Sequence, residues 1–214
     1  MLTLIKDKPR SAAMNMAIDE TLFDELQNGA CLRVYLWDKA YTTIGYFQAN
    51  DCNAVRRLTG GLRVDHKDDI SYGFCANADD WKCVYNQEET YKYLHAAIKK
   101  ALESIGYDCN FSGSNSQKQA LCVKTLYADD LLLDGKKVVG SCMRRRGKKI
   151  LVQGSVHLKL TGAQRESFTT EFAKNLAAVL NTSVKVSHLT VSQLQNAEAL
   201  AKEKYSSLKW NNKL

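Results

Sequence analysis

The chain has 214 residues, 45% of them hydrophobic, which suits one compact globular domain over residues 1–214. Its formal net charge of +7 and its pI near 9.0 favour an acidic partner. Its seven cysteines form no CxxC pair and its four histidines give no zinc-ligand spacing, so the sequence argues against a metal site, and the odd cysteine count favours a reducing compartment. The sequence shows no leader pattern and no apolar run near the roughly 18 residues of a membrane span, so we expect a soluble cytoplasmic protein without membrane contact.

Helices and strands are predicted to alternate along the chain without a long linker. The first helix begins after Ser11, which can cap it, and ends near Gly29, because apolar residues recur at helical spacing between them. In chain order, we expect a helix at 12–28, strands at 31–37 and 42–47, strand pieces at 55–58 and 62–64, a strand at 70–74, a helix at 88–106, strands at 131–133, 138–142 and 150–160, and helices at 163–181 and 191–205. The glycine-containing dipeptides at 134–135 and 146–147 suit hairpin turns. The sum is an α+β fold in which helices flank a mixed, mostly antiparallel sheet.

The stretch RRLTGGLRVDHKDDISYGF, residues 56–74, has two physical interpretations. Its strand pieces around the turn at 59–61 suit a hairpin, whereas the two glycines of that turn also let a ligand approach the backbone. Neighbouring residues of a strand point to opposite faces, so we expect one of Arg56 and Arg57 to face a site and the other to be a solvated or salt-bridged surface residue. Arg57 is next to the turn and is the one that we expect to face the site, which leaves Arg56 for the surface. His66 alone is more typical of a hydrogen-bonded structural histidine than of a catalyst.

Five segments resemble a known family in the order in which that family carries them. They are MNMAIDETLF (14–23), LRVYLWDKAYTTIGYFQ (32–48), the stretch at 56–74, DGKKVVGSC (134–142) and KYSSLKWN (204–211). Together they resemble the lipoate-protein ligase and octanoyltransferase family, and are nearest to its cysteine-dependent octanoyltransferases of the LipM type. The resemblance implies a biotin/lipoate protein ligase-like catalytic domain that attaches an octanoyl or lipoyl group to a specific lysine of a carrier domain.

Two chemistries occur in this family. Ligases activate lipoate with ATP and Mg²⁺ through lipoyl-AMP, whereas the octanoyltransferases take an acyl group from a thioester through a cysteine-bound intermediate and require no cofactor. Leu62 follows the glycine pair where many ligases have a third glycine, and Lys67 follows His66 where many have aspartate, so the chain resembles the transferases more. Gln153 stands where the family commonly has histidine, which leaves a non-catalytic binding protein as a distant alternative.

The resemblance implies two catalytic residues. Lys137 matches a lysine that ligases and transferases share, and its ammonium can stabilise the acyl carbonyl oxygen as that oxygen gains charge. Cys122 lies 137 − 122 = 15 residues before it, at a spacing similar to that of the nucleophilic cysteine in one class of octanoyltransferases. The alternative for Cys122 is a buried structural cysteine.

The resemblance also implies a set of substrate-binding residues. Gly60 and Gly61 would allow close approach of the backbone to the acyl chain, and Gly140 would leave room beside Lys137. Arg57 would face the site, and His66 would shape the pocket rather than act as a general base.

The implied partners are acidic proteins. The donor would be acyl carrier protein or another octanoyl or lipoyl donor, and the acceptor would be the lipoyl domain of a 2-oxoacid dehydrogenase E2 or the glycine-cleavage H protein. The basic run RRRGKK (144–149) is either a solvated hairpin tip or a docking site for such a partner. A nucleic-acid-binding module is the rival of another class, but the sequence has no RRM, KH or zinc-finger signature, so we expect no nucleic-acid partner.

Overall fold

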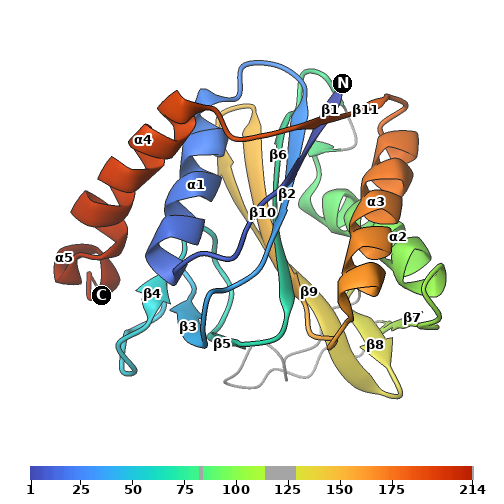
Figure 1. Ribbon diagram of the computed structural model, residues 1–214, viewed down its shortest axis with the longest axis horizontal. Helices are drawn as coiled ribbons and strands as arrows, with labels where there is room; N and C mark the ends of the chain where they lie inside the picture. Colours follow the sequence, from blue (N-terminus) through green and yellow to red (C-terminus); the bar gives the residue numbers. More distant parts are fainter. Residues whose placement is uncertain (82–83, 114–128, 214) are drawn as a thin grey trace.

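Among residues 1–81, 84–113 and 129–213, which the computed structural model describes, eight strands form one sheet (Figure 1). Across the sheet these strands are β11 (Val184–Ser187), β1 (Leu2–Lys6), β2 (Ala30–Tyr35), β6 (Ile70–Asn77), β10 (Lys149–Val156), β9 (Lys136–Arg146), β8 (Leu131–Leu133) and β7 (Asn110–Phe111). β1 pairs in parallel with both β2 and β11, and the other neighbouring pairs are antiparallel. The predicted mixed, mostly antiparallel sheet is confirmed, although the sequence did not predict β1, β7 or β11.

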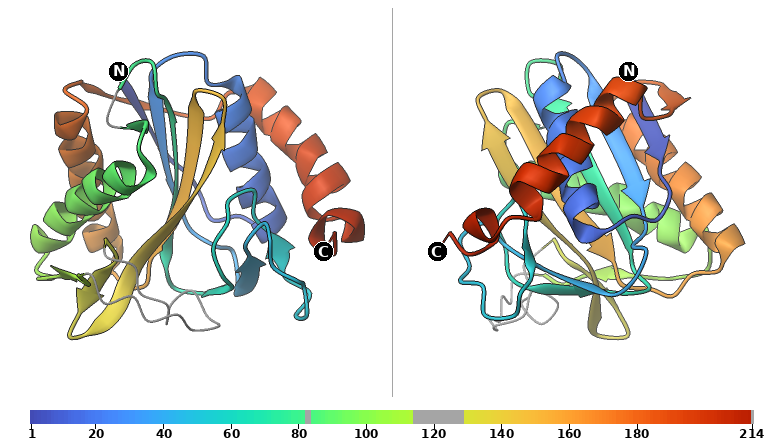
Figure 2. Two further views of the ribbon diagram at one scale, coloured as in Figure 1. Left: turned by 180° about the vertical axis from the view of Figure 1, so that it is seen from behind. Right: turned by 60° about the vertical axis from the view of Figure 1, so that its left-hand side comes forward.

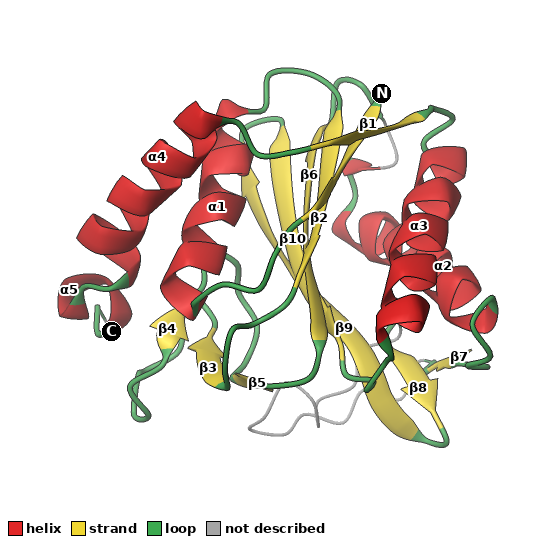
Figure 3. Cartoon of the chain, viewed as in Figure 1, coloured by secondary structure: helices red, strands yellow, loops and turns green. Residues whose placement is uncertain are grey.

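Helices cover both faces of this sheet (Figures 1 and 3). On one face lie α2 (Gln87–Glu103) and α3 (Gly162–Val179); on the other lies α1 (Ala12–Glu25), with α4 (Val191–Leu200) packed on α1. A π-helical turn (Ala201–Tyr205) and the short α5 (Leu208–Asn211) follow α4. In the described part of the chain, no helix combines the length and the apolar character that crossing a membrane requires.

The ends of α1 show what helical spacing can and cannot locate. Ser11 caps α1 as predicted, because its side chain accepts a hydrogen bond from the Met14 backbone N–H. The helix ends at Glu25 rather than near Gly29, because Leu26 already has extended backbone with ψ 117°. Apolar spacing that continues past a helix therefore does not locate its last residue.

Two apolar clusters form the core, one between the sheet and each of the two helix layers that Figure 2 shows on its faces. The larger lies between the sheet and the α2–α3 layer and includes Tyr72, Phe168 and Phe172, none of which is measurably exposed. The smaller lies between the sheet and α1 and includes Met16, Ile18 and other side chains of that helix. Because both faces are covered, the central strands β6 and β10 are buried along nearly their whole length.

A second, three-stranded sheet lies below α1 in Figure 1 and carries the first part of the stretch at 56–74, whereas residues 70–74 belong to β6 of the large sheet. In it, β3 (Tyr41–Ile44) lies between β4 (Val55–Arg56) and β5 (Val64–His66), parallel to β4 and antiparallel to β5. The predicted hairpin of residues 55–58 and 62–64 is therefore wrong, since both pieces pair with β3 and not with each other.

A close backbone contact at Gly45 accounts for this topology. The glycine turn crosses the end of β3 there, and a Cβ at position 45 would lie 1.9 Å from the Gly61 carbonyl oxygen. The Tyr46 backbone N–H also donates to the Thr59 carbonyl, at 2.9 Å. Because the crossing joins segments that do not pair with each other, the alternating pattern of each strand piece contained no information about its partner.

Candidate functional site

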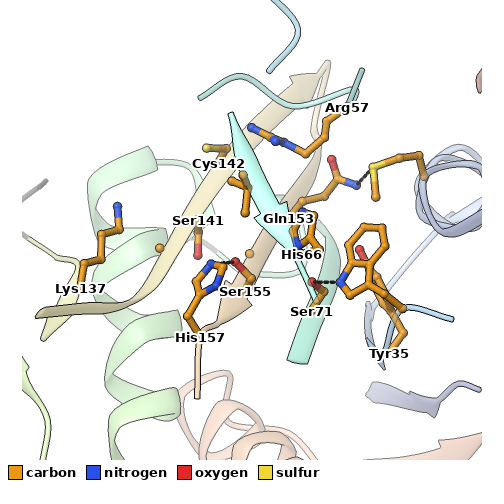
Figure 4. A pocket seen from close by; sticks show the side chains of 15 residues that line it. Tyr35, Arg57, His66, Ser71, Lys137, Ser141, Cys142, Gln153, Ser155 and His157 are labelled. Carbon is orange, nitrogen blue, oxygen red and sulfur yellow. Dashed lines mark hydrogen bonds between the residues drawn. The ribbon is translucent and has the colours of Figure 1, made fainter. Parts of the chain in front are cut away.

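Two cavities meet along β9, and Figure 4 shows the side chains that line the first of them. The first, which we call the narrow cleft, has a volume of about 40 Å³, and Met16, Tyr35, Trp37 and Val64 form its apolar wall. The second, the wide cavity, has a volume of about 520 Å³ and lies between the glycine turn, the start of α2 and β9. Three residues of β9 line both cavities, namely Lys137, Ser141 and Cys142. The wide cavity falls in the range of small-molecule sites, of about 300–1,000 Å³.

Lys137 is buried at this junction. Its side chain is 5% exposed, and its Nζ lies 2.7 Å from Asp130 Oδ2. The ammonium lies over Gly140, where an added Cβ would be 2.5 Å from Lys137 Cε and 2.8 Å from Nζ. The structure therefore places Lys137 and Gly140 together, and the absence of a side chain at 140 leaves the room that the lysine occupies. A buried ammonium paired with a carboxylate keeps a fixed positive charge beside both cavities.

The glycine turn packs on β9 beside Lys137. Gly61 has φ +82°, and a Cβ there would lie 2.1 Å from Cys142 Sγ, so this position requires glycine both for its backbone and for its space. Gly60 differs, because an added Cβ would meet nothing within 4 Å. Both glycines line the wide cavity, while Cys122 lies outside the described residues.

Arg57 and Arg56 are both buried. Arg57 lines the narrow cleft and holds the turn, because its Nη2 donates to the carbonyls of Gly60, at 3.0 Å, and Leu62, at 2.8 Å. The expectation that Arg56 is a surface residue is wrong, since it is 0% exposed. Its guanidinium donates to backbone carbonyls of residues 45, 46, 48, 210 and 211, and such unpaired buried carbonyls require donors.

His66 has partners for both ring nitrogens. Its Nδ1 lies 2.8 Å from Asp69 Oδ2 and its Nε2 lies 2.9 Å from Thr43 Oγ1, while the ring stacks on Trp37 with centroids 4.0 Å apart. Burial alone would raise the pKa of Asp69, but the hydrogen bond with His66 and the charge of that ring lower the pKa overall. These contacts hold the ring in place, and His66 lines the narrow cleft.

A buried polar network packs against the glycine turn and connects it to α1. Arg33 donates to Asp19 through Nη1 and to Asp7 through Nη2, both at 2.8 Å, and its side chain is 0% exposed. The second oxygen of Asp19 accepts a hydrogen bond from Gln153 Nε2 at 2.8 Å, and Thr59 donates to Gln153 Oε1 at 2.8 Å. Gln153 therefore connects helix α1 to the glycine turn through its two amide atoms.

A family of known proteins matches most of the chain. The lipoyl protein ligase A/B catalytic domain matches residues 11–198 of the chain. The chain belongs to this family. The sequence-based family assignment is thus confirmed, and Gln153 is the residue that this member of the lipoyl protein ligase A/B family has where histidine was expected.

Curated relatives in the lipoyl protein ligase A/B family include octanoyltransferases. The octanoyltransferase LipM of Oceanobacillus iheyensis is 30% identical, over 73% of this chain and 63% of that protein. The octanoyltransferase LipM of Brevibacillus brevis is 25% identical, over 94% of this chain and 95% of that protein. The chain thus spans less than two thirds of the first of these relatives and nearly all of the second.

Solved structures with the same fold include lipoate-protein ligases. A lipoate-protein ligase A bound with ATP superposes with a TM-score of 0.76 at 20% identity, over 98% of this chain and 97% of that one. The bipartite lipoate protein ligase of Thermoplasma acidophilum, described with its E2 lipoyl domain, gives a TM-score of 0.74 at 18% identity, over 98% and 94%. At these identities the likeness confirms the fold of the lipoyl protein ligase A/B catalytic domain.

Three residues that line the two cavities were not predicted from the sequence, namely Ser141, Cys142 and His95. His95 comes from α2, is 2% exposed and lines the wide cavity, and its Nε2 lies 2.6 Å from Ser141 Oγ. A signal for it was present, because His95 lies in the apolar stripe of the helix expected at 88–106. A histidine buried in such a stripe needs hydrogen-bond partners from another element.

The basic run at 144–149 makes contacts within the chain. Arg145 donates to the carbonyls of Val84 and Tyr85, and Arg146 pairs with Asp24. Lys148 Nζ lies 2.8 Å from Asp79 Oδ2, and Arg144 lies over the Tyr46 ring at 4.7 Å. Lys149 donates to the Asp24 carbonyl at 2.7 Å. Much of this positive charge therefore has partners inside the protein, which weakens the interpretation of the run as a docking site.

Proposed function

We propose that this protein is an acyltransferase of protein lipoylation that attaches an octanoyl group to a lysine of a lipoyl carrier domain. The observation that carries the proposal is the buried ammonium of Lys137, held over Gly140 where the apolar narrow cleft meets the wide cavity. An ammonium fixed in a protected site stabilises the oxyanion that forms when a nucleophile attacks an acyl carbonyl. The octanoyltransferase relatives support this function over that of a ligase.

The two cavities suit the two parts of the substrate. An eight-carbon chain would enter the narrow cleft against Trp37 and Met16, with its carbonyl at Lys137, because apolar surface gains free energy on leaving water. At about 40 Å³ the cleft holds only a few water molecules, so its side chains must shift to admit the chain. The wide cavity would admit the donor and then the acceptor lysine.

Cys122 is the proposed nucleophile, on the strength of its spacing to Lys137. Its thiolate would attack the thioester carbon, a new C–S bond would form, and the bond to the donor sulfur would break. The donor would leave as a thiol, with the proton that Cys122 lost when its thiolate formed. The amine of the acceptor lysine would then attack the acyl-enzyme, forming a C–N bond and releasing the Cys122 sulfur. A covalent intermediate lets the donor leave before the acceptor arrives.

The proposed partners are an octanoyl carrier protein as donor and a lipoyl domain of a 2-oxoacid dehydrogenase E2, or the glycine-cleavage H protein, as acceptor. The net charge of +7 favours acidic partners of this kind. The bipartite ligase of Thermoplasma acidophilum, described together with an E2 lipoyl domain, supports the same class of acceptor. The transferase reaction needs no cofactor, whereas a ligase would need ATP and Mg²⁺.

A donor comparison tests the proposal. An apo lipoyl domain is incubated with the protein and either octanoyl-carrier thioester or lipoate with ATP and Mg²⁺, and its mass is measured over time. We expect modification from the thioester, a loss of roughly 10²–10³-fold in rate for Lys137→Ala, and a normal rate for the control Lys136→Ala, whose side chain is exposed. Modification from lipoate and ATP alone would instead support a ligase, and no modification from either donor would support a binding protein.

A further inference from the structure

A chain of three hydrogen-bonded side chains reaches the wide cavity from inside the fold. Tyr72 on β6 is hydrogen-bonded through its phenol to Ser141 Oγ on β9. Ser141 Oγ lies 2.6 Å from His95 Nε2 on α2, and His95 Nδ1 lies 2.5 Å from the Asp129 carbonyl oxygen. Tyr72 and His95 are 0% and 2% exposed. Three separate elements therefore meet at one serine hydroxyl.

The direction of each hydrogen bond follows from its partners. A carbonyl oxygen only accepts, so His95 Nδ1 carries a hydrogen and donates it to Asp129. In the neutral ring Nε2 is then an acceptor, and Ser141 donates its hydroxyl hydrogen to it. Burial raises the pKa of Tyr72, which keeps the phenol protonated as a donor to Ser141. A serine hydroxyl that donates to an unprotonated imidazole can pass its proton to that base and accept another proton in its place.

The surroundings of His95 favour its neutral form. Burial, the largest effect, lowers the pKa of His95, and the hydrogen bond to the Asp129 carbonyl opposes this effect only in part. Among the described residues, the titratable groups that face the ring are Tyr91 on its own helix and Asp129, Asp130 and Lys137 on the neighbouring elements, while Tyr72 contacts its partner Ser141. Near pH 7 the imidazole is therefore neutral, so its Nε2 can accept a proton.

Ser141 lies where the acyl carbonyl would be attacked. It lines both cavities, as Lys137 does four residues earlier on the same strand, and His95 lines the wide cavity through which the acceptor would enter. The Asp129 carbonyl fixes the imidazole from its far side, so the ring presents one nitrogen to the hydroxyl.

We propose that Ser141 and His95 form a relay that accepts a proton from the acceptor lysine during acyl transfer, a role that rests on the function proposed above. The carrier lysine is an ammonium near pH 7, with an ordinary pKa of about 10.4, and must lose two protons to become an amide. As the C–N bond forms and the C–S bond breaks, one proton goes to the departing thiolate. The other goes to Ser141 Oγ while the serine proton moves to His95 Nε2, and the imidazolium later releases it to water. Ser141 touches the substrate amine, and His95 is a positioning residue that acts through Ser141.

The test separates acylation of the enzyme from transfer to an amine. In His95→Gln the amide oxygen can still accept the Ser141 hydrogen bond but does not take up a proton near neutral pH. We expect His95→Gln and Ser141→Ala to form the acyl-enzyme at the unsubstituted rate, but to transfer the acyl group to the carrier lysine roughly 10²-fold more slowly. With hydroxylamine, which is already uncharged near pH 7, release should stay within a factor of a few of the unsubstituted rate. His188→Gln, at an exposed histidine, is the matched control and should leave both steps unchanged.

The pH profile gives a second readout. The unsubstituted protein should show an acid-side inflection in the transfer step at a pH below 6.5, the ordinary pKa of histidine, and His95→Gln should lack it. Equal slowing with the carrier and with hydroxylamine, or transfer at the unsubstituted rate in either variant, would overturn the relay. An unsubstituted protein that forms no acyl-enzyme would overturn the proposed function, and the relay with it.

Discussion

Replacement of Gly61 by alanine tests the packing of the glycine turn on β9. The new Cβ would occupy a left-handed conformation with φ +82°, which costs an L-residue about 1–2 kcal/mol. It would also lie 2.1 Å from Cys142 Sγ, and overpacking of this kind costs about 1–3 kcal/mol. We therefore expect Gly61→Ala to lower the free energy of unfolding by about 2–5 kcal/mol, the sum of these two ranges.

Cys142→Ala separates the two contributions. The Cβ at position 142 would lie 3.4 Å and Arg57 Nη2 3.3 Å from the new Cβ at position 61, so the clash with Sγ disappears while the backbone part remains. Urea unfolding of the two single variants, the double variant and the unsubstituted protein gives the coupling between the positions. We expect Gly61→Ala to cost only about 1–2 kcal/mol in the Cys142→Ala background, which is a coupling of about 1–3 kcal/mol.

Gly60→Ala is the matched control, because its Cβ would meet nothing within 4 Å and it has no left-handed φ. It should change the free energy of unfolding by about 0.5 kcal/mol or less. An equal cost of Gly61→Ala in both backgrounds would refute the contact between the turn and β9, and with it the wall that these residues form for the wide cavity.

Three further predictions concern Lys137 and the buried network. In Gly140→Ala the Cβ would lie 2.5 Å from Lys137 Cε and displace the ammonium, so acyl transfer should slow by up to about 10²-fold; transfer at the unsubstituted rate in the donor assay would contradict this. Arg33→Met leaves the buried Asp19 carboxylate without its charged partner, whereas Asp7 keeps its ion pair with Arg10. It should lower the free energy of unfolding by about 3–5 kcal/mol in urea, and a loss below about 1 kcal/mol would show that the network is dispensable. Burial alone would raise the pKa of Asp7, but Arg10 and Arg33 lower it below the ordinary value of 3.8. The stability that the ionised carboxylate contributes is therefore present above pH 3.8 and is lost as the pH falls through the lower pKa of the folded state. Asp7→Asn should remove this part of the acid dependence of unfolding, and an identical pH dependence in the variant would contradict the assignment.

The helices and the central strands could be predicted because each buries a periodic apolar face. Residues 88–106 carry a stripe at helical spacing, and the structure has α2 (Gln87–Glu103) there, packed against α3. Pairing between distant segments could not be predicted in the same way. β1 and β11 lie near opposite ends of the chain and pair in parallel, and short alternating segments give no indication of such a partner.

The candidate site likewise contains local contacts, which could be predicted, and long-range contacts, which could not. Lys137 and Gly140 are three residues apart on one strand, so a local motif places them together, as the structure confirms. The burial of Arg56 could not be predicted, because its carbonyl partners include Trp210, which is 154 residues away along the chain. The contact between His95 and Ser141 joins residues 46 positions apart and depends on how α2 packs over β9. Contacts of this kind follow from the tertiary fold and have no local pattern.

The mass of the intact protein after incubation with octanoyl-carrier thioester tests the central claim most directly. We predict an octanoyl adduct on the unsubstituted protein, an adduct of equal extent on the control Cys52→Ala, and none on Cys122→Ala. The adduct should also leave when an apo lipoyl domain is added and appear on its lysine. No adduct on the unsubstituted protein, or an undiminished adduct on Cys122→Ala, would contradict the cysteine-bound mechanism, and an adduct lost instead in Cys142→Ala would transfer the nucleophile to that thiol.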